Sequence, residues 1–134
     1  MGHKSKVTEK YITLIKDTLD HLAITESKCQ IFCKPIGMVC KELCTDLGLP
    51  NTDHVNPIRR CTQMIQRLMQ EDNYIEFLGF SRITMAGSLV YIAAIMEGCR
   101  ETQRNICITL CISMPSLARC YKKIVRKLRC QVEV

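Results

Sequence analysis

Hydrophobic residues recur along most of this 134-residue chain at the three- and four-residue spacing of amphipathic helices, not at the alternation of strands. The first stripe predicts a helix that ends near His21. Its members are Val7, Tyr11, Leu14, Ile15, Leu19 and Leu22. Beyond it, Thr25 is predicted to open a capping box. Pro35 is expected to break or kink the helix that precedes it.

Two further helices are predicted from capping signals. The second stripe stops at Gly48, a residue typical of a left-handed C-cap. This stripe comprises Ile36, Val39, Cys40, Leu43, Cys44 and Leu47. Asn56 followed by Pro57 indicates the start of a third helix, because asparagine caps helices and proline suits their first turn. The third stripe comprises Ile58, Cys61, Ile65, Leu68 and Met69.

The fourth predicted helix differs from the others. Ser81 caps it, and it runs from Ile83 to Glu97 before Gly98. Residues 85–96 are apolar or small on every side, which is typical of a helix buried in a core. The small side chains at 86–88 would let neighbouring helices approach closely. The sequence therefore predicts a central helix surrounded by others.

The last forty residues predict a helix-turn-helix. Thr102 caps a short helix over residues 103–110, a turn covers residues 111–113, and Ser113 caps a longer helix that ends near Cys130. The second helix of such a unit can lie in the major groove of DNA. Its inward stripe would be Leu117, Cys120, Tyr121, Ile124, Val125 and Leu128. Its basic residues would then face outward, where phosphates are met.

Charge supports a polyanionic partner. The chain has a net charge of +6, and residues 119–129 contain six basic residues and no acid. These are Arg119, Lys122, Lys123, Arg126, Lys127 and Arg129. Such a block favours nucleic acid. A solvated helix face is the alternative on charge alone.

Length and cysteine usage exclude other classes. One domain of common size is expected, and the longest apolar run, residues 89–96, is too short to cross a bilayer. The N-terminus lacks the apolar segment of a secretory signal. Ten cysteines include no C-x-x-C pair, and the close pairs are spaced i,i+4. We interpret them as small buried hydrophobes in a reducing compartment, with zinc binding or a disulfide framework as weaker alternatives.

Internal repetition suggests the domain boundaries. Residues 7–16 align with residues 117–126, tyrosine on tyrosine, with apolar residues at the inward positions of both. We therefore expect residues 1–24 to hold the closing helix of a preceding unit plus a linker. Residues 25–131 would form one complete repeat, and residues 132–134 a tail.

Several segments resemble the family of transcription initiation factor TFIIB. Residues 81–93, Ser-Arg-Ile-Thr-Met-Ala-Gly-Ser-Leu-Val-Tyr-Ile-Ala, are similar to the central helix of its cyclin-like repeats. Thr-Gln-Arg-Asn-Ile at 102–106, followed by Arg-Cys-Tyr-Lys-Lys-Ile at 119–124, resembles its helix-turn-helix. Leu-Gly-Leu-Pro at 47–50 matches a helix link. The likeness covers about residues 34–130 and corresponds to the second repeat.

The resemblance implies an all-α, five-helix cyclin-like repeat with a buried central helix and a C-terminal helix-turn-helix, preceded by one extra helix. It also implies a general initiation factor that binds promoter DNA and the TATA-binding protein and recruits RNA polymerase. It implies no membrane partner. The expected location is the nucleus, or a cytoplasmic viral factory if the source is a large DNA virus. No cofactor is implied for this stretch, since the family's zinc ribbon would lie upstream.

The resemblance also selects site residues. The family's base-reading positions correspond to Pro115 and Ala118, and neither side chain can donate a hydrogen bond to guanine. Contacts to the DNA backbone are expected from Arg104, Ser116, Arg119, Lys122, Lys123 and Arg126. The resemblance places Cys111 where the family has its turn glycine.

Two other functions compete. An enzyme is not expected, because no phosphate loop, nucleophile elbow or paired-histidine helix is present, and His21 and His54 are expected at the surface. The stronger alternative is a cyclin-fold adaptor that binds protein and never touches DNA. For the initiation factor that the resemblance implies, exposed residues of the helices that contain Ile36 and Ile58 are candidate contacts for the TATA-binding protein or polymerase.

Overall fold

The computed structural model describes residues 6–130, with side chains from residue 9 onward. This part of the chain forms helices and contains no strand. The elements are α1 (Lys6–Asp20), α2 (Lys28–Asp46), α3 (Pro57–Met69), the 3-10 helix η1 (Gln70–Phe77), α4 (Arg82–Met96), α5 (Gln103–Leu110) and α6 (Met114–Leu128). No helix among these is long and apolar enough to cross a membrane. The side chain of Val7 and the predicted tail at 132–134 lie outside the described residues.

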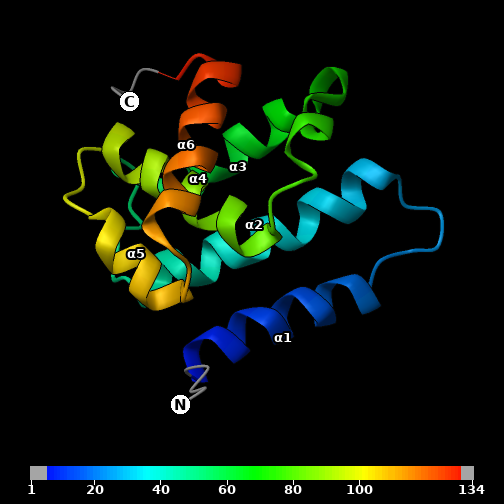
Figure 1. The fold of residues 1–134 in the computed structure, drawn as a ribbon, viewed down its shortest axis with the longest axis horizontal. Coiled ribbons are helices and arrows are strands. Elements are labelled where there is room, and N and C mark those ends of the chain that lie inside the picture. Colours follow the sequence, from blue (N-terminus) through cyan, green and yellow to red (C-terminus); the bar gives the residue numbers. More distant parts are fainter. Residues whose placement is uncertain (1–5, 131–134) are drawn as a thin grey trace.

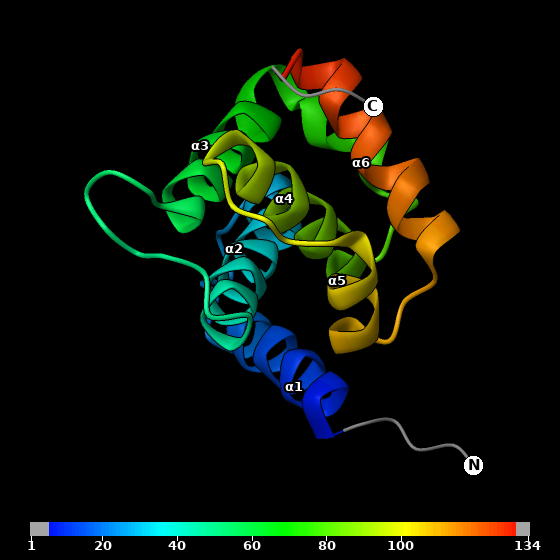
Figure 2. The same ribbon diagram turned by 90° about the vertical axis from the view of Figure 1, so that its left-hand side faces the viewer.

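Helix α4 occupies the centre of the molecule. It packs against α2, α3, α5 and α6, and the two ribbon views place it among them (Figures 1 and 2). Ten of its fifteen residues are buried. The predicted central helix is therefore confirmed. Helices α1 and α6 lie on opposite sides of the molecule (Figures 1 and 2).

Gly87 allows α5 and α6 to approach α4 closely. A Cβ atom at Gly87 would lie 2.8 Å from Leu110 Cδ1, 3.2 Å from Ile106 Cγ2 and 3.4 Å from Leu117 Cδ1. The first of these separations is shorter than any ordinary carbon contact. The predicted close approach at this small residue is confirmed, and a larger side chain would push the helices apart.

The predicted capping residues are confirmed at four helices. The side chains of Asn56, Ser81, Thr102 and Ser113 each accept a hydrogen bond from the backbone amide three residues later. Gly48 has a φ of +67°, which only glycine adopts readily. These caps could be predicted from the sequence because each one involves only residues that are close together along the chain.

Two local expectations were wrong or incomplete. Helix α2 is capped by Ser27, whose Oγ accepts from Gln30 N at 3.1 Å, and not by Thr25. A capping box needs glutamate or glutamine three residues after the capping residue. Gln30 stands at that position relative to Ser27, whereas Lys28 stands there relative to Thr25. The 3-10 helix at residues 70–77 was not predicted. It includes Glu71 and Asp72 with positive φ angles of 52° and 57°.

Pro35 lies inside α2 and does not break it, so the expected break was wrong. Proline has no N–H, which leaves the carbonyl of Ile31 without its helical donor. Arg82 Nη2 donates to this carbonyl at 3.1 Å, and Arg82 Nε donates to the carbonyl of Phe32 at 3.2 Å. An arginine from α4 thus supplies the missing donor, and α2 continues through the proline.

Helix α1 rests against α2 through one buried tyrosine and a polar contact. Tyr11 is fully buried, and its Oη donates to Asp46 Oδ2 at 2.5 Å. Lys10 Nζ lies 2.9 Å from Asp46 Oδ1 and 3.3 Å from Glu42 Oε2. The other described members of the predicted stripe are half-buried. That α1 closes a preceding repeat stays a prediction.

Candidate nucleic-acid interface

Helices α5 and α6 form a helix-turn-helix. Cys111 ends α5 in the left-handed conformation, with φ 54° and ψ 47°. The amide of Ile112 then donates to the carbonyl of Cys107 at 3.1 Å, which closes the turn before α6 begins at Met114. Left-handed geometry favours glycine. A cysteine nevertheless occupies this position without preventing the turn.

The inner face of α6 is buried as predicted. All six residues of its stripe lie in the core: Leu117, Cys120, Tyr121, Ile124, Val125 and Leu128. Gln103 Nε2 donates to Tyr121 Oη at 3.1 Å and to Tyr91 Oη at 3.3 Å, and the two tyrosine rings are 5.0 Å apart. This contact joins α4, α5 and α6, and it fixes the orientation of the helix-turn-helix. Sequence reasoning gave Gln103 no such role.

The outer face of α6 carries three exposed cations. Arg119, Lys122 and Arg126 follow one another at spacings of three and four residues, so they lie on one side of the helix. Among the described residues, no carboxylate forms an ion pair with any of them. We call these three residues the outer cations. They leave a positive surface free to meet a polyanion.

Two further lysines of α6 lie on its flank and have partners in η1. Lys123 Nζ donates to the carbonyl of Glu76 at 2.6 Å and lies 5.3 Å from the centre of the Phe77 ring. Lys127 forms an ion pair with the Glu76 carboxylate. The hydrogen bond from Lys127, together with the charges of both lysines, lowers the pKa of Glu76. These two lysines therefore support the position of α6 against η1.

The remaining predicted site residues are distributed as follows. Pro115 is exposed and Ala118 is half-buried, and both share the outer side of α6 with the outer cations. Ser116 is half-buried, and its Oγ lies 2.8 Å from Ser113 Oγ at the start of the helix. Arg104 is exposed in the first turn of α5.

The family model of the transcription factor TFIIB repeat matches residues 32–127. The match runs from the second turn of α2 to the last turn of α6 and covers well over half of the chain. The chain belongs to this family. In comparisons with curated proteins and with solved structures, nothing matches.

The TFIIB repeat confirms the expected fold class. Helices α2 to α6 make the five-helix cyclin-like repeat, with α4 buried and the helix-turn-helix at its end. Helix α1 precedes the matched residues. The family is one of transcription factors, not of enzymes.

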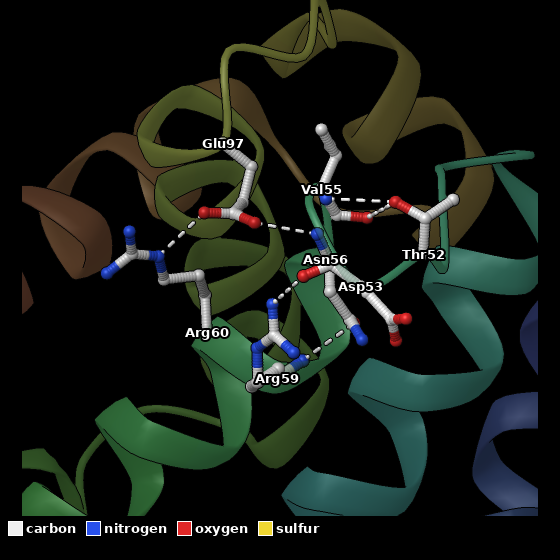
Figure 3. Close-up of polar contacts among 7 residues, drawn as sticks. All are labelled: Thr52, Asp53, Val55, Asn56, Arg59, Arg60 and Glu97. Carbon is white, nitrogen blue, oxygen red and sulfur yellow. Dashed lines mark hydrogen bonds and ion pairs between the residues drawn. The ribbon is translucent and has the colours of Figure 1, made fainter.

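A carboxylate at the end of α4 connects distant parts of the TFIIB repeat (Figure 3). Glu97 Oε1 accepts from the amide of Asn56 at 2.6 Å, and Oε2 accepts from Arg60 Nε at 2.8 Å. The bond from Asn56 and then that from Arg60 lower the pKa of Glu97. Both carboxylate oxygens are thus engaged in joining α4 to the start of α3, which is a structural role.

The cysteines are more varied than expected. Six are buried, which agrees with the prediction, but Cys29, Cys99 and Cys130 are half-buried and Cys111 is exposed. Cys111 is exposed because it occupies the turn before α6. Burial raises the pKa of Cys120 to about 11, so this thiol stays protonated. Within residues 6–130, no three histidine, cysteine or acidic side chains are placed to share a metal ion.

Proposed function

We propose that this TFIIB repeat binds duplex promoter DNA through the outer face of α6. In this proposal it acts with the TATA-binding protein to recruit RNA polymerase in the nucleus. The observation that carries the proposal is the exposure of the outer cations without any carboxylate partner among the described residues. Phosphates are the natural partners of such a surface, because each contact releases counterions from the duplex.

The contribution of each proposed DNA-binding residue follows from its surroundings. Lys122 and Arg126 can reach phosphates without leaving a carboxylate of the described chain, and Arg119 would give up only a 3.5 Å contact with Ser116 Oγ. Lys123 would have to leave the Glu76 carbonyl, so we assign it a smaller share. Arg104 would add a contact from α5, and Ser116 one from the start of α6.

The proposed binding is sensitive to salt and weakly selective for sequence. Phosphate contacts fix the position of a protein on the duplex but carry no sequence information. The residues at the base-reading positions, Pro115 and Ala118, offer no hydrogen-bond donor. The exposed parts of α2 and α3 are the proposed contacts for the TATA-binding protein and polymerase.

Charge reversal of the outer cations tests the proposal. The variant Arg119→Glu, Lys122→Glu, Arg126→Glu should lose about tenfold or more of its affinity for every short duplex tried at low salt. A matched control reverses three exposed lysines of α1 and α2, Lys16, Lys28 and Lys41, with the same change in net charge. The control should keep most of its affinity, because its charges lie elsewhere.

Fluorescence anisotropy with several labelled duplexes measures these affinities. Equal losses in the two variants would mean that net charge alone drives binding, and the assignment to α6 would fail. Failure of the unmodified chain to bind any duplex at low salt would favour a protein-binding adaptor with the same fold.

A further inference from the structure

The first two turns of α6 present carbon atoms where a helix-turn-helix meets base edges. Met114 keeps 46% of its surface exposed, Pro115 is exposed, and Ala118 is half-buried one turn later. The N-terminal residues of the second helix are those that approach the bases in this motif. We call Met114, Pro115 and Ala118 the apolar patch.

The polar groups beside the apolar patch already form hydrogen bonds within the chain. Ser113 Oγ accepts from the Ser116 amide at 3.2 Å and lies 2.8 Å from Ser116 Oγ. Arg119 Nη2 lies 3.5 Å from the same Ser116 oxygen. Pro115 has no backbone N–H to offer. The surface is therefore poorly equipped for the donor and acceptor code of the major groove.

We infer that the apolar patch recognises the 5-methyl groups that pyrimidines place in the major groove, chiefly those of thymine. This inference rests on the proposed DNA binding and adds a base preference to it. The thymine methyl is the apolar feature of the major-groove edge, and alanine and other apolar side chains contact it favourably. The outer cations, which share a side of α6 with Pro115 and Ala118, would hold the patch against the groove by binding phosphates on either side.

The expected preference is modest and can be stated as a fold-change. Removing one methyl group from water favours binding about fourfold. Two methyl groups under the patch would give about fifteenfold. The preference should be independent of salt, because the contact involves no charge, whereas the overall affinity should fall steeply with salt.

The test compares duplexes that differ only in methyl groups. An alternating A·T duplex of about two helical turns is compared with the same duplex in which uracil replaces every thymine. A second pair compares cytosine with 5-methylcytosine in an alternating G·C duplex. The hydrogen-bond donors and acceptors of the bases are the same in both duplexes of a pair. Any hydrogen bond from Arg119 to a base therefore contributes equally to both affinities and does not change their ratio. We expect the methylated member of each pair to bind about four- to fifteenfold more tightly.

Two variants assign the effect to the patch. Pro115→Ser with Ala118→Ser should bring the ratio between methylated and unmethylated duplexes towards one. Lys122→Gln should weaken binding to both members equally and leave the ratio unchanged. The unmodified chain decides whether a methyl preference exists, so a variant that folds poorly does not leave that preference untested; the double variant then assigns the preference to the patch.

The outcomes separate the two proposals. Tight binding that ignores the methyl groups would overturn the inference and leave the proposed DNA binding intact. A methyl preference that survives in the Pro115 and Ala118 variant would overturn the assignment to the patch. Absence of binding to all four duplexes at low salt would overturn the proposed function, and the inference with it.

Discussion

The two terminal helices, α1 and α6, have similar hydrophobic patterns but differ in how deeply their side chains are buried. Helix α6 buries six side chains against the core. Helix α1, aligned with it tyrosine on tyrosine, has one fully buried residue among its described side chains, Tyr11, and its other stripe residues are half-buried. A shared hydrophobic pattern therefore predicts that both are helices, but not how deeply each one packs.

Lys10 of α1 and the outer cations of α6 differ in whether the fold places a carboxylate beside them. On α1, Lys10 is paired with the carboxylates of Asp46 and Glu42. On α6, the outer cations meet no carboxylate of the described chain. A basic side chain is available to a polyanion only where the fold places no acid beside it.

The comparison predicts unequal costs for equal truncations. Ile124→Ala in α6 should lower the free energy of unfolding by about 3 kcal/mol, because Ile124 is fully buried. Ile15→Ala in α1 should cost about 1 kcal/mol, because Ile15 is half-buried. Urea unfolding measures both values. Equal costs would show that α1 is packed as firmly as α6.

The packing of α4 against α5 and α6 should make one glycine hard to replace. Gly87→Ala should destabilise the fold by about 1–2 kcal/mol, since the new Cβ would lie 2.8 Å from Leu110 Cδ1. Gly37→Ala in α2 is the control, because its Cβ would lie 3.7 Å from Ile65 Cδ1. The control should gain up to about 1 kcal/mol from helix propensity. A gain in both variants, measured by thermal unfolding, would contradict the close approach.

The polar attachment of α1 should depend on pH. Burial tends to raise the pKa of Asp46, but hydrogen bonds from Tyr11 and Lys10 outweigh it, so the pKa is lowered. The stabilisation is therefore present above the unfolded pKa and is lost as pH falls through the folded value. Tyr11→Phe should cost about 1 kcal/mol at pH 6 and less near pH 3. A difference from wild type that stays constant between these pH values would contradict this role of Asp46.

The flank of α6 should show the smallest effect. Lys123→Ala should lower stability by about 0.5–1 kcal/mol, because the ammonium lies over Phe77 and donates to the Glu76 carbonyl. The neighbouring variant Lys122→Ala should leave stability within about 0.5 kcal/mol of wild type, since its side chain is exposed. A larger loss from Lys122→Ala would mean that this lysine has a partner in the fold.

Local features of the fold were predictable from the sequence. The caps at Asn56, Ser81, Thr102 and Ser113, the central helix and the inner stripe of α6 all follow from residues within one or two helical turns of each other. Such signals need no knowledge of tertiary structure. The cationic side of α6 was predictable for the same reason.

Contacts between distant segments were not predictable. Helix α2 continues through Pro35 because Arg82, at the start of α4, donates a hydrogen bond to the carbonyl of Ile31. Lys123 and Lys127 are engaged because Glu76, far away in sequence, lies beside them. Hydrophobic periodicity predicts the side of the helix on which a lysine lies, but it does not predict which residue of another element contacts that lysine.

The salt dependence of duplex binding tests the central claim most directly. The affinity of the unmodified chain for one duplex is measured over a range of salt concentrations beside the variant Arg119→Gln, Lys122→Gln, Arg126→Gln. If the outer cations contact three phosphates, the slope of log K against log salt should become shallower by about 3 in the variant. An unchanged slope would contradict the claim that these residues meet the DNA backbone.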